Sequence, residues 1–141
     1  MQNPYQPILK TIRTLKKDTF NIHNRTGIAW IFQLRVGLSP LKSHKMHHKF
    51  IDTPVDKCLC SLNAETTRHF LLECPNFTAH RQEFLETIDS ILILNDLENI
   101  SDRNKVHLIL YGHDKLNFAE NREVLKATIK FISKSGRFSR I

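Results

Sequence analysis

The chain has 141 residues and a formal net charge of +7, with 40% hydrophobic and 25% charged residues. That length predicts one domain that is large enough to bury a hydrophobic core. No window is long and apolar enough to predict a transmembrane helix, and residues 1–5 lack the hydrophobic region of a signal peptide. Three cysteines are an odd number, which fits a reducing compartment better than a secreted disulfide framework. We therefore expect an intracellular protein, in the nucleus or the cytoplasm, without membrane contact.

The net charge lies entirely in the first part of the chain. Residues 1–57 contain ten Lys and Arg against three Asp and Glu, whereas residues 58–141 contain eleven of each kind. This asymmetry predicts a basic arm or face that contacts a polyanion, although solvated lysines are the simpler interpretation. Eight basic side chains are candidates for contacts to nucleic-acid phosphates: Lys10, Arg13, Lys16, Lys17, Arg35, Lys42, Lys45 and Lys49.

The spacing of apolar residues predicts a mainly α-helical chain. Residues 7–18 predict a short amphipathic helix that begins at a proline, and the turn-rich residues 19–26 predict a loop. The apolar run at residues 27–38 fits either a buried helix or a strand, and we favour a helix that ends near Gly37. Residues 41–50 predict a second short helix, which is basic.

All three cysteines lie with one histidine in a stretch of seventeen residues, in the pattern C-x-C-x8-H-x4-C. Three thiolates and an imidazole are the ligands of a closed structural zinc site, which leaves no position open for a substrate. We therefore predict a structural Zn2+ ion held by Cys58, Cys60, His69 and Cys74. The single residue between the first two cysteines is a tighter spacing than usual, so three buried cysteines that act as small apolar residues are the alternative.

Residues within and after this motif predict where helices begin and end. Asn63 predicts the cap of a helix through about Glu73, and Pro75 restarts the chain as a further helix with Cys74 at its cap. On a continuous helix, His69 and Cys74 would diverge by about 140°. Because a residue before proline is pushed out of the helical region, we expect Cys74 to turn back towards His69.

Two more helices are predicted towards the C-terminus. Ser101 predicts the cap of a helix that ends at Gly112. Asn117 and Glu120 resemble a capping box for a last helix through about residue 133. The expected fold is therefore mainly α, a small helical domain with an embedded CCHC zinc knuckle.

The expected organisation has four segments. Residues 1–26 form a basic N-terminal helix and linker, and residues 27–57 form an apolar helix followed by a basic one. Residues 58–75 form the zinc knuckle, the name kept below for this segment. Residues 76–141 form the C-terminal helices and a short basic tail.

No catalytic constellation is visible in the sequence. The chain has no G-x-S-x-G elbow, no Gly-rich phosphate loop and no H-E-x-x-H motif, and Asp102 and Asp114 are isolated. We therefore expect a protein that is not an enzyme. The group of His44, His47 and His48 is expected to be a solvated basic face and not a second metal site.

Residues 58–77 resemble the CCHC knuckle near the C-terminus of non-LTR (LINE-type) retrotransposon reverse transcriptases. Beyond the close cysteine pair, the shared features are Glu65-Thr66, the His69-Phe-Leu-Leu run, Cys74-Pro75, Phe77 and Arg81. Stretches within residues 33–50 and 110–138 also resemble the family, so the likeness covers about residues 27–138.

The resemblance implies a non-catalytic C-terminal part of an element-encoded polyprotein, whose polymerase and endonuclease residues lie outside this chain. It implies that the knuckle binds zinc and that this region contacts template RNA or target DNA, a choice that stays open. The reverse transcriptase body of the same element is a further expected partner. The alternative function is a structural or protein-interaction helical module without independent activity, because the neutral C-terminal half carries two amphipathic helices.

Overall fold

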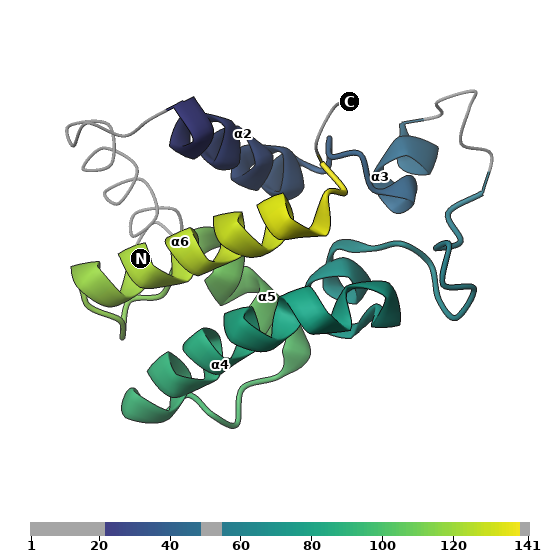
Figure 1. Cartoon of the computed structure of the whole chain (residues 1–141). Helices are drawn as coiled ribbons and strands as arrows, with labels where there is room; N and C mark the ends of the chain where they lie inside the picture. The colour runs from purple at the N-terminus through teal and green to yellow at the C-terminus, as the bar shows by residue number, and fades with distance from the viewer. Residues whose placement is uncertain (1–21, 49–54, 139–141) are drawn as a thin grey trace.

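The computed structural model describes residues 22–48 and 55–138 of the chain (Figure 1). The helix predicted over residues 7–18 therefore lies outside the described residues, as do five candidate phosphate contacts: Lys10, Arg13, Lys16, Lys17 and Lys49. The described α-helices are α2 (Ile22–Val36), α3 (Lys42–His47), α4 (Thr78–Leu94), α5 (Asp102–Tyr111) and α6 (Phe118–Ser135). The only β pairing within the described residues is a single bridge between Lys57 and Ala64, so the prediction of a mainly α fold is confirmed.

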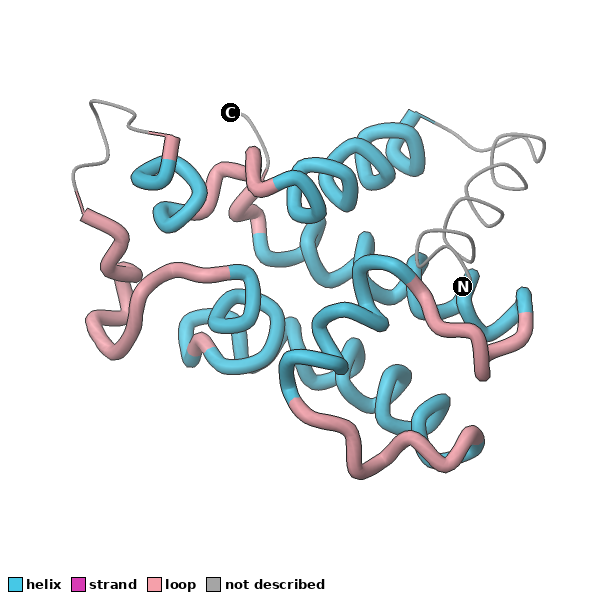
Figure 2. Tube along the Cα trace, turned by 180° about the vertical axis from the view of Figure 1, so that it is seen from behind, coloured by secondary structure: helices cyan, strands magenta, loops and turns pink. Residues whose placement is uncertain are grey.

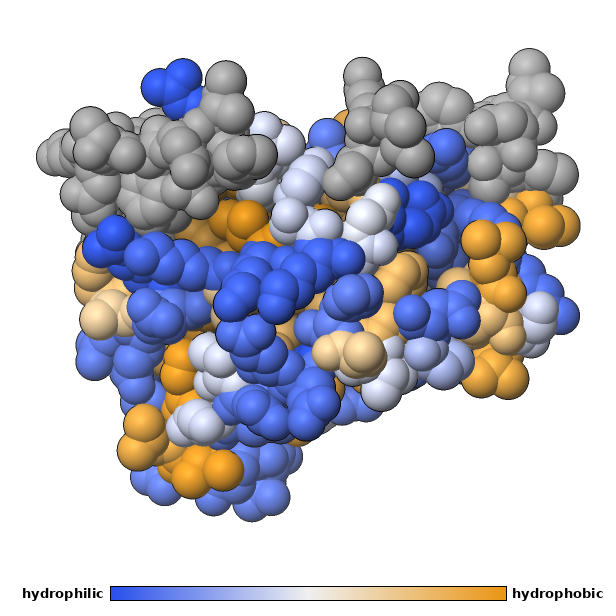
Figure 3. Space-filling view, in the orientation of Figure 1, coloured by the Kyte–Doolittle hydropathy of each residue, from blue (hydrophilic) through white to orange (hydrophobic). Residues whose placement is uncertain are grey.

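Three helices, α2, α4 and α5, pack around α6. It contacts α2 on one side and α4 on the other, while α5 packs on α2 and α6 from the face that Figure 2 turns towards the viewer. The inward face of α6 is buried, and Phe131 on that face stacks on Phe84 of α4 with ring centroids 5.1 Å apart. A hydrophilic band follows the outer face of α6 in Figure 3. The buried faces of α4 and α6 thus meet in the hydrophobic core.

The caps predicted for α5 and α6 are confirmed. The side-chain oxygen of Ser101 accepts a hydrogen bond from the Asn104 amide at 3.2 Å, and α5 ends at Gly112, where φ is 76°. Asn117 Oδ1 accepts from the Glu120 amide at 2.8 Å, and the Glu120 carboxylate accepts from the Asn117 amide at 3.0 Å. These local hydrogen bonds satisfy amides that have no partner inside the helix.

The helix favoured over residues 27–38 is confirmed, but it begins earlier than predicted, at Ile22. The loop predicted over residues 19–26 is therefore wrong for its last five positions. The helix forms despite the turn-forming residues in this stretch, because α2 packs against α6. Gly27 is buried at this contact. A Cβ atom at Gly27 would overlap the side chain of Ile129. The glycine permits this close approach, at a cost of about 1 kcal/mol in helix propensity.

We predict that Gly27→Ala lowers the free energy of unfolding by roughly 1–3 kcal/mol, because the added methyl group overpacks the contact with Ile129. Urea unfolding measures this change. In an Ile129→Ala background the same substitution should be neutral or stabilising, since alanine is the better helix former by about 1 kcal/mol. Equal destabilisation in both backgrounds would contradict the packing explanation.

Candidate metal centre

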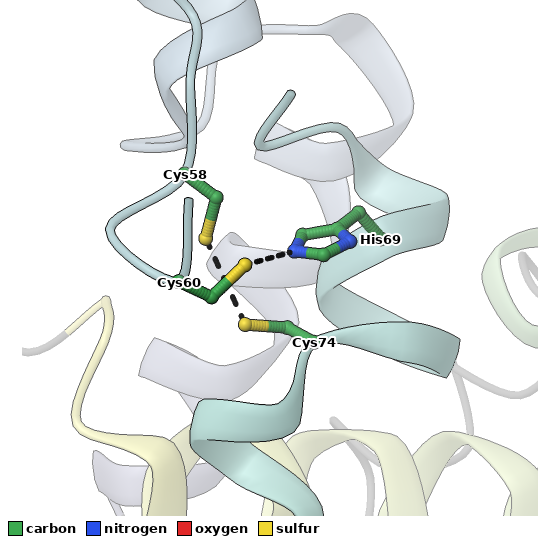
Figure 4. Close-up of side chains that lie close together, drawn as sticks. All are labelled: Cys58, Cys60, His69 and Cys74. Atoms are coloured by element: carbon green, nitrogen blue, oxygen red, sulfur yellow. Dashed lines mark hydrogen bonds between the residues drawn. The ribbon is translucent and has the colours of Figure 1, made fainter. Parts of the chain in front are cut away.

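The C-x-C pair lies on a tight turn. The Cys58 amide donates a hydrogen bond to the Asn63 carbonyl, and the Ser61 amide donates to the Cys58 carbonyl, both at 2.9 Å. Ser61 adopts a φ of 66°, which bends the chain sharply between these bonds. The sulfur atoms of Cys58 and Cys60 point towards the same centre (Figure 4). Asn63 closes this turn, so the prediction that it caps a helix is wrong.

The helical segment that carries the histidine is shorter and wider than predicted. It contains η1 (His69–Glu73), a π-turn in which the Cys74 amide donates to the carbonyl of His69 at 2.7 Å, five residues earlier. Thr66 caps the segment, because its Oγ1 accepts a hydrogen bond from the His69 amide at 3.1 Å. A π-turn is wider than an α-turn, which reduces the divergence expected between side chains five residues apart. The π-turn is therefore a second reason, beyond the proline, that His69 and Cys74 meet.

Cys74 leaves the helical path as the following proline predicts. Its φ and ψ are −58° and 122°, outside the helical region. The chain continues through η2 (Pro75–Phe77), a single turn of 3-10 helix, directly into α4. The predicted helix end at Glu73 and restart at Pro75 are confirmed.

The four predicted ligands converge on one point. Their ligand atoms all lie within 4.8 Å of one another, and the residues are Cys58, Cys60, His69 and Cys74 (Figure 4). The Sγ atoms of Cys58 and Cys74 are 3.7 Å apart, and Cys60 Sγ is 3.2 Å from Nε2 of His69. In a tetrahedral site with Zn–S bonds of about 2.3 Å, two sulfur atoms are separated by about 3.8 Å. This CCHC group is positioned to hold a metal ion.

The environment of the thiols favours a cation. Cys58, Cys74 and the His69 ring are buried, while Cys60 is half-buried. A backbone hydrogen bond from Leu62, helped by the ring of His69, lowers the pKa of Cys60 to about 6 against the opposing effect of burial. Burial raises the pKa of Cys74 to about 12, and its neighbour Cys58 adds to this effect. Bringing three thiolates this close together is unfavourable without a positive charge, which a bound metal ion supplies.

Arg81 of α4 links the knuckle to the helical core through hydrogen bonds. Its buried guanidinium donates to the carbonyls of Phe70 and Cys74 at 2.8 Å and to that of Leu71 at 2.9 Å. Carbonyls at the end of a helix lack partners inside it, and a guanidinium offers several donors in one plane. The same group lies 5.5 Å from the ring centroid of Phe131 in α6. In the sequence, Arg81 was notable only as part of the family resemblance. In the structure, it joins the knuckle to α4.

Buried Glu65 joins three distant parts of the chain. Its carboxylate accepts from the Arg137 guanidinium at 2.6 and 2.9 Å and from the Lys42 amide at 2.8 Å. Arg137 also donates to the carbonyl of Pro40 at 2.8 Å. Burial raises the pKa of Glu65, but the hydrogen bonds from Arg137 and Lys42 outweigh it and hold this pKa below its ordinary value. The two side chains lie 72 residues apart in the chain, and no pattern in the sequence predicted their contact.

α3 is anchored to the knuckle by His44. Its Nε2 lies 3.2 Å from Oγ1 of Thr67, and its Nδ1 lies 2.6 Å from Oγ of Ser39. Burial, with repulsion from His48 and His47, lowers the pKa of His44. The prediction of a solvated histidine face is therefore wrong for His44, which is half-buried, whereas His47 and His48 are exposed.

The structure describes three of the predicted phosphate-contacting residues, namely Arg35, Lys42 and Lys45. Arg35 on α2 lies 4.9 Å from the ring centroid of Phe32 and 4.7 Å from that of Tyr111, so it has a packing role. The Nζ atom of Lys42 donates to the carbonyl of Lys57 at 3.1 Å. Lys42 and Lys45 lie on α3, beside the knuckle, whereas Arg35 lies on a different helix.

Comparisons with protein-family models, with curated proteins and with solved structures found no match for this chain. The fold and the site together define a small helical domain with a CCHC group that is positioned to hold a metal ion. Within the described part of the chain, no helix is long and apolar enough to cross a membrane.

We predict that Glu65→Ala lowers the free energy of unfolding by about 3 kcal/mol, because it leaves the guanidinium of Arg137 and the amide of Lys42 without their acceptor. Urea unfolding of the metal-loaded protein measures the loss. Glu98→Ala is the matched control, since Glu98 is exposed, and it should change stability by less than about 0.5 kcal/mol. A loss as small as that of the control would contradict the role of Glu65.

Proposed function

We propose that this chain is a zinc-stabilised nucleic-acid-binding module and a non-catalytic C-terminal part of a non-LTR retrotransposon reverse transcriptase. The observation that carries the proposal is the convergence of Cys58, Cys60, His69 and Cys74. Thiolate and imidazole ligands favour zinc over magnesium or calcium. Four protein ligands complete a tetrahedral site, so the ion would have a structural and not a catalytic role.

The charge of the chain supports a polyanionic partner. The net charge of +7 comes from residues 1–57, whereas three thiolates and one Zn2+ leave a single net negative charge. The knuckle therefore would not attract phosphate itself but would position basic elements nearby. Its hydrogen bonds to α3, through Glu65 and Thr67, hold Lys42 and Lys45 beside it. We infer weakly sequence-selective binding to RNA or DNA through phosphates.

The contacts of two motif residues support the retrotransposon assignment. Glu65 and Arg81 are among the residues on which the resemblance rests. Glu65 accepts hydrogen bonds from two other parts of the chain, and Arg81 donates to three carbonyls of the knuckle. These contacts give a physical reason for an acid and an arginine at these positions of a CCHC motif. The same resemblance suggests the reverse transcriptase body of the element as a partner.

A structural or protein-interaction module is the second candidate, and exposed apolar side chains favour it. Leu59 and Leu62 on the knuckle turn are 81% and 68% exposed, and Ile93 and Leu94 at the end of α4 are also exposed. The apolar side chains at the right edge of Figure 3 lie over the knuckle loop of Figure 1. Clustered exposed apolar residues mark protein contacts. This candidate predicts an intact metal centre without nucleic-acid affinity.

Fluorescence anisotropy with short labelled RNA and DNA strands tests the first candidate. We expect the affinity of the zinc-loaded protein to fall by at least about a hundredfold between about 50 and 200 mM salt, because several phosphate contacts release counterions. Replacing Lys10, Arg13, Lys16 and Lys17 by glutamine should reduce the slope of log affinity against log salt by roughly 3.

The matched control replaces four basic residues of the neutral half by glutamine: Arg103, Lys115, Lys126 and Lys130. It removes the same formal charge, and we expect it to change the slope by less than about 1. Equal effects of the two variants would contradict a basic N-terminal contact surface. A zinc-loaded protein that does not bind either strand at low salt would favour the second candidate.

A further inference from the structure

Among the described residues, the second ring nitrogen of His69, Nδ1, has no hydrogen-bond partner. Nε2 faces the cysteines, 3.2 Å from Cys60 Sγ, so it is the nitrogen that would bind a metal. A neutral imidazole that binds a metal through Nε2 carries its proton on Nδ1, and that proton needs an acceptor. Nδ1 is buried and unsatisfied, and the side chain of His69 is only 3% exposed. A buried donor without an acceptor is unfavourable, which raises the question of what accepts this proton.

Glu73 lies within reach of that proton. Its Oε2 is 3.6 Å from Nδ1 of His69, longer than a hydrogen bond but within the range of an ion pair. Its Oε1 is 3.2 Å from Nε of Arg68. The side chain of Glu73 is 34% exposed, so it has room to rotate. A shift of roughly 0.6 Å would bring Oε2 to hydrogen-bonding distance.

We propose that Glu73 is a positioning residue of the metal centre, whose carboxylate accepts the Nδ1–H of His69 when Nε2 binds the metal. The inference rests on the zinc site proposed above. Metal-bound histidines commonly donate their other N–H to a carboxylate, which fixes the tautomer, orients the ring and makes the ligand nitrogen more basic. Glu73 thus strengthens the metal site without touching the metal.

Glu65, the buried acid of the knuckle, is not available for this role. Both carboxylate oxygens of Glu65 are engaged by Arg137, and one also accepts from the Lys42 amide. Glu73 instead sits at the end of the π-turn that begins with His69. Arg68 offsets the negative charge that Glu73 adds beside three thiolates.

Zinc affinity of the reduced full-length chain, measured by competition with a chromophoric chelator, tests the proposal. We expect Glu73→Ala to weaken zinc binding by about 10- to 100-fold. Glu73→Gln should recover most of this loss, because its side-chain oxygen still accepts a hydrogen bond. Glu98→Ala removes an exposed carboxylate elsewhere and should bind zinc like the wild type.

Nitrogen-15 NMR of the histidine rings distinguishes a hydrogen bond to His69 from a general effect of Glu73 on stability. In the zinc-loaded wild type, we expect Nδ1 of His69 to carry a proton that exchanges slowly with water. In Glu73→Ala this signal should shift or broaden through exchange. Unchanged affinity, an unchanged signal, or equal losses in the Glu73 and Glu98 variants would overturn the role of Glu73. A wild-type chain that binds no zinc would instead overturn the proposed function.

Discussion

Three thiols and one imidazole lie within 4.8 Å of one another at the place where the knuckle, α3 and the helical core meet. Burial favours protonated thiols, whereas a divalent cation favours thiolates, so the stability of this corner is tied to occupation by a metal. The backbone around it has little regular structure of its own: a sharp turn at Ser61, a π-turn from His69 and an extended residue at Cys74. Phe70 and Leu71 bury the helical part of the knuckle in the core, and a metal ion would join the turn of Cys58 and Cys60 to that part.

Two hydrogen-bonded groups connect the knuckle to the rest of the molecule. Arg81 connects the π-turn to α4 and lies over a phenylalanine ring of α6. Glu65 connects the knuckle to α3 and to Arg137, which follows the C-terminal end of α6. The knuckle is therefore the junction at which the short basic helix α3 meets the helical core. In the proposed function, the knuckle positions the basic residues of α3, and Glu73 supports the knuckle by orienting His69.

Features that depend on neighbouring residues could be predicted from the sequence, whereas contacts between distant residues could not. The caps at Ser101 and Asn117, the proline after Cys74 and the ligand set itself are encoded within a few residues, and the structure reproduces them. The close approach of α2 to Ile129 joins residues far apart in the chain, and the partner of Glu65 lies 72 residues away. Neither is marked by a local pattern. The π-turn was also missed, because it adds one residue to an otherwise ordinary helical turn.

If a bound zinc ion organises the knuckle and, through it, α3, removal of the ion should loosen both. The most direct test is to measure zinc per chain by elemental mass spectrometry, together with amide hydrogen exchange before and after chelation, in the wild type and in Cys74→Ser. We expect about one zinc per chain, and a loss of exchange protection in residues 55–75 and α3 on chelation and in the variant. A purified wild type without zinc, or one whose protection is unchanged when zinc is removed, would contradict it.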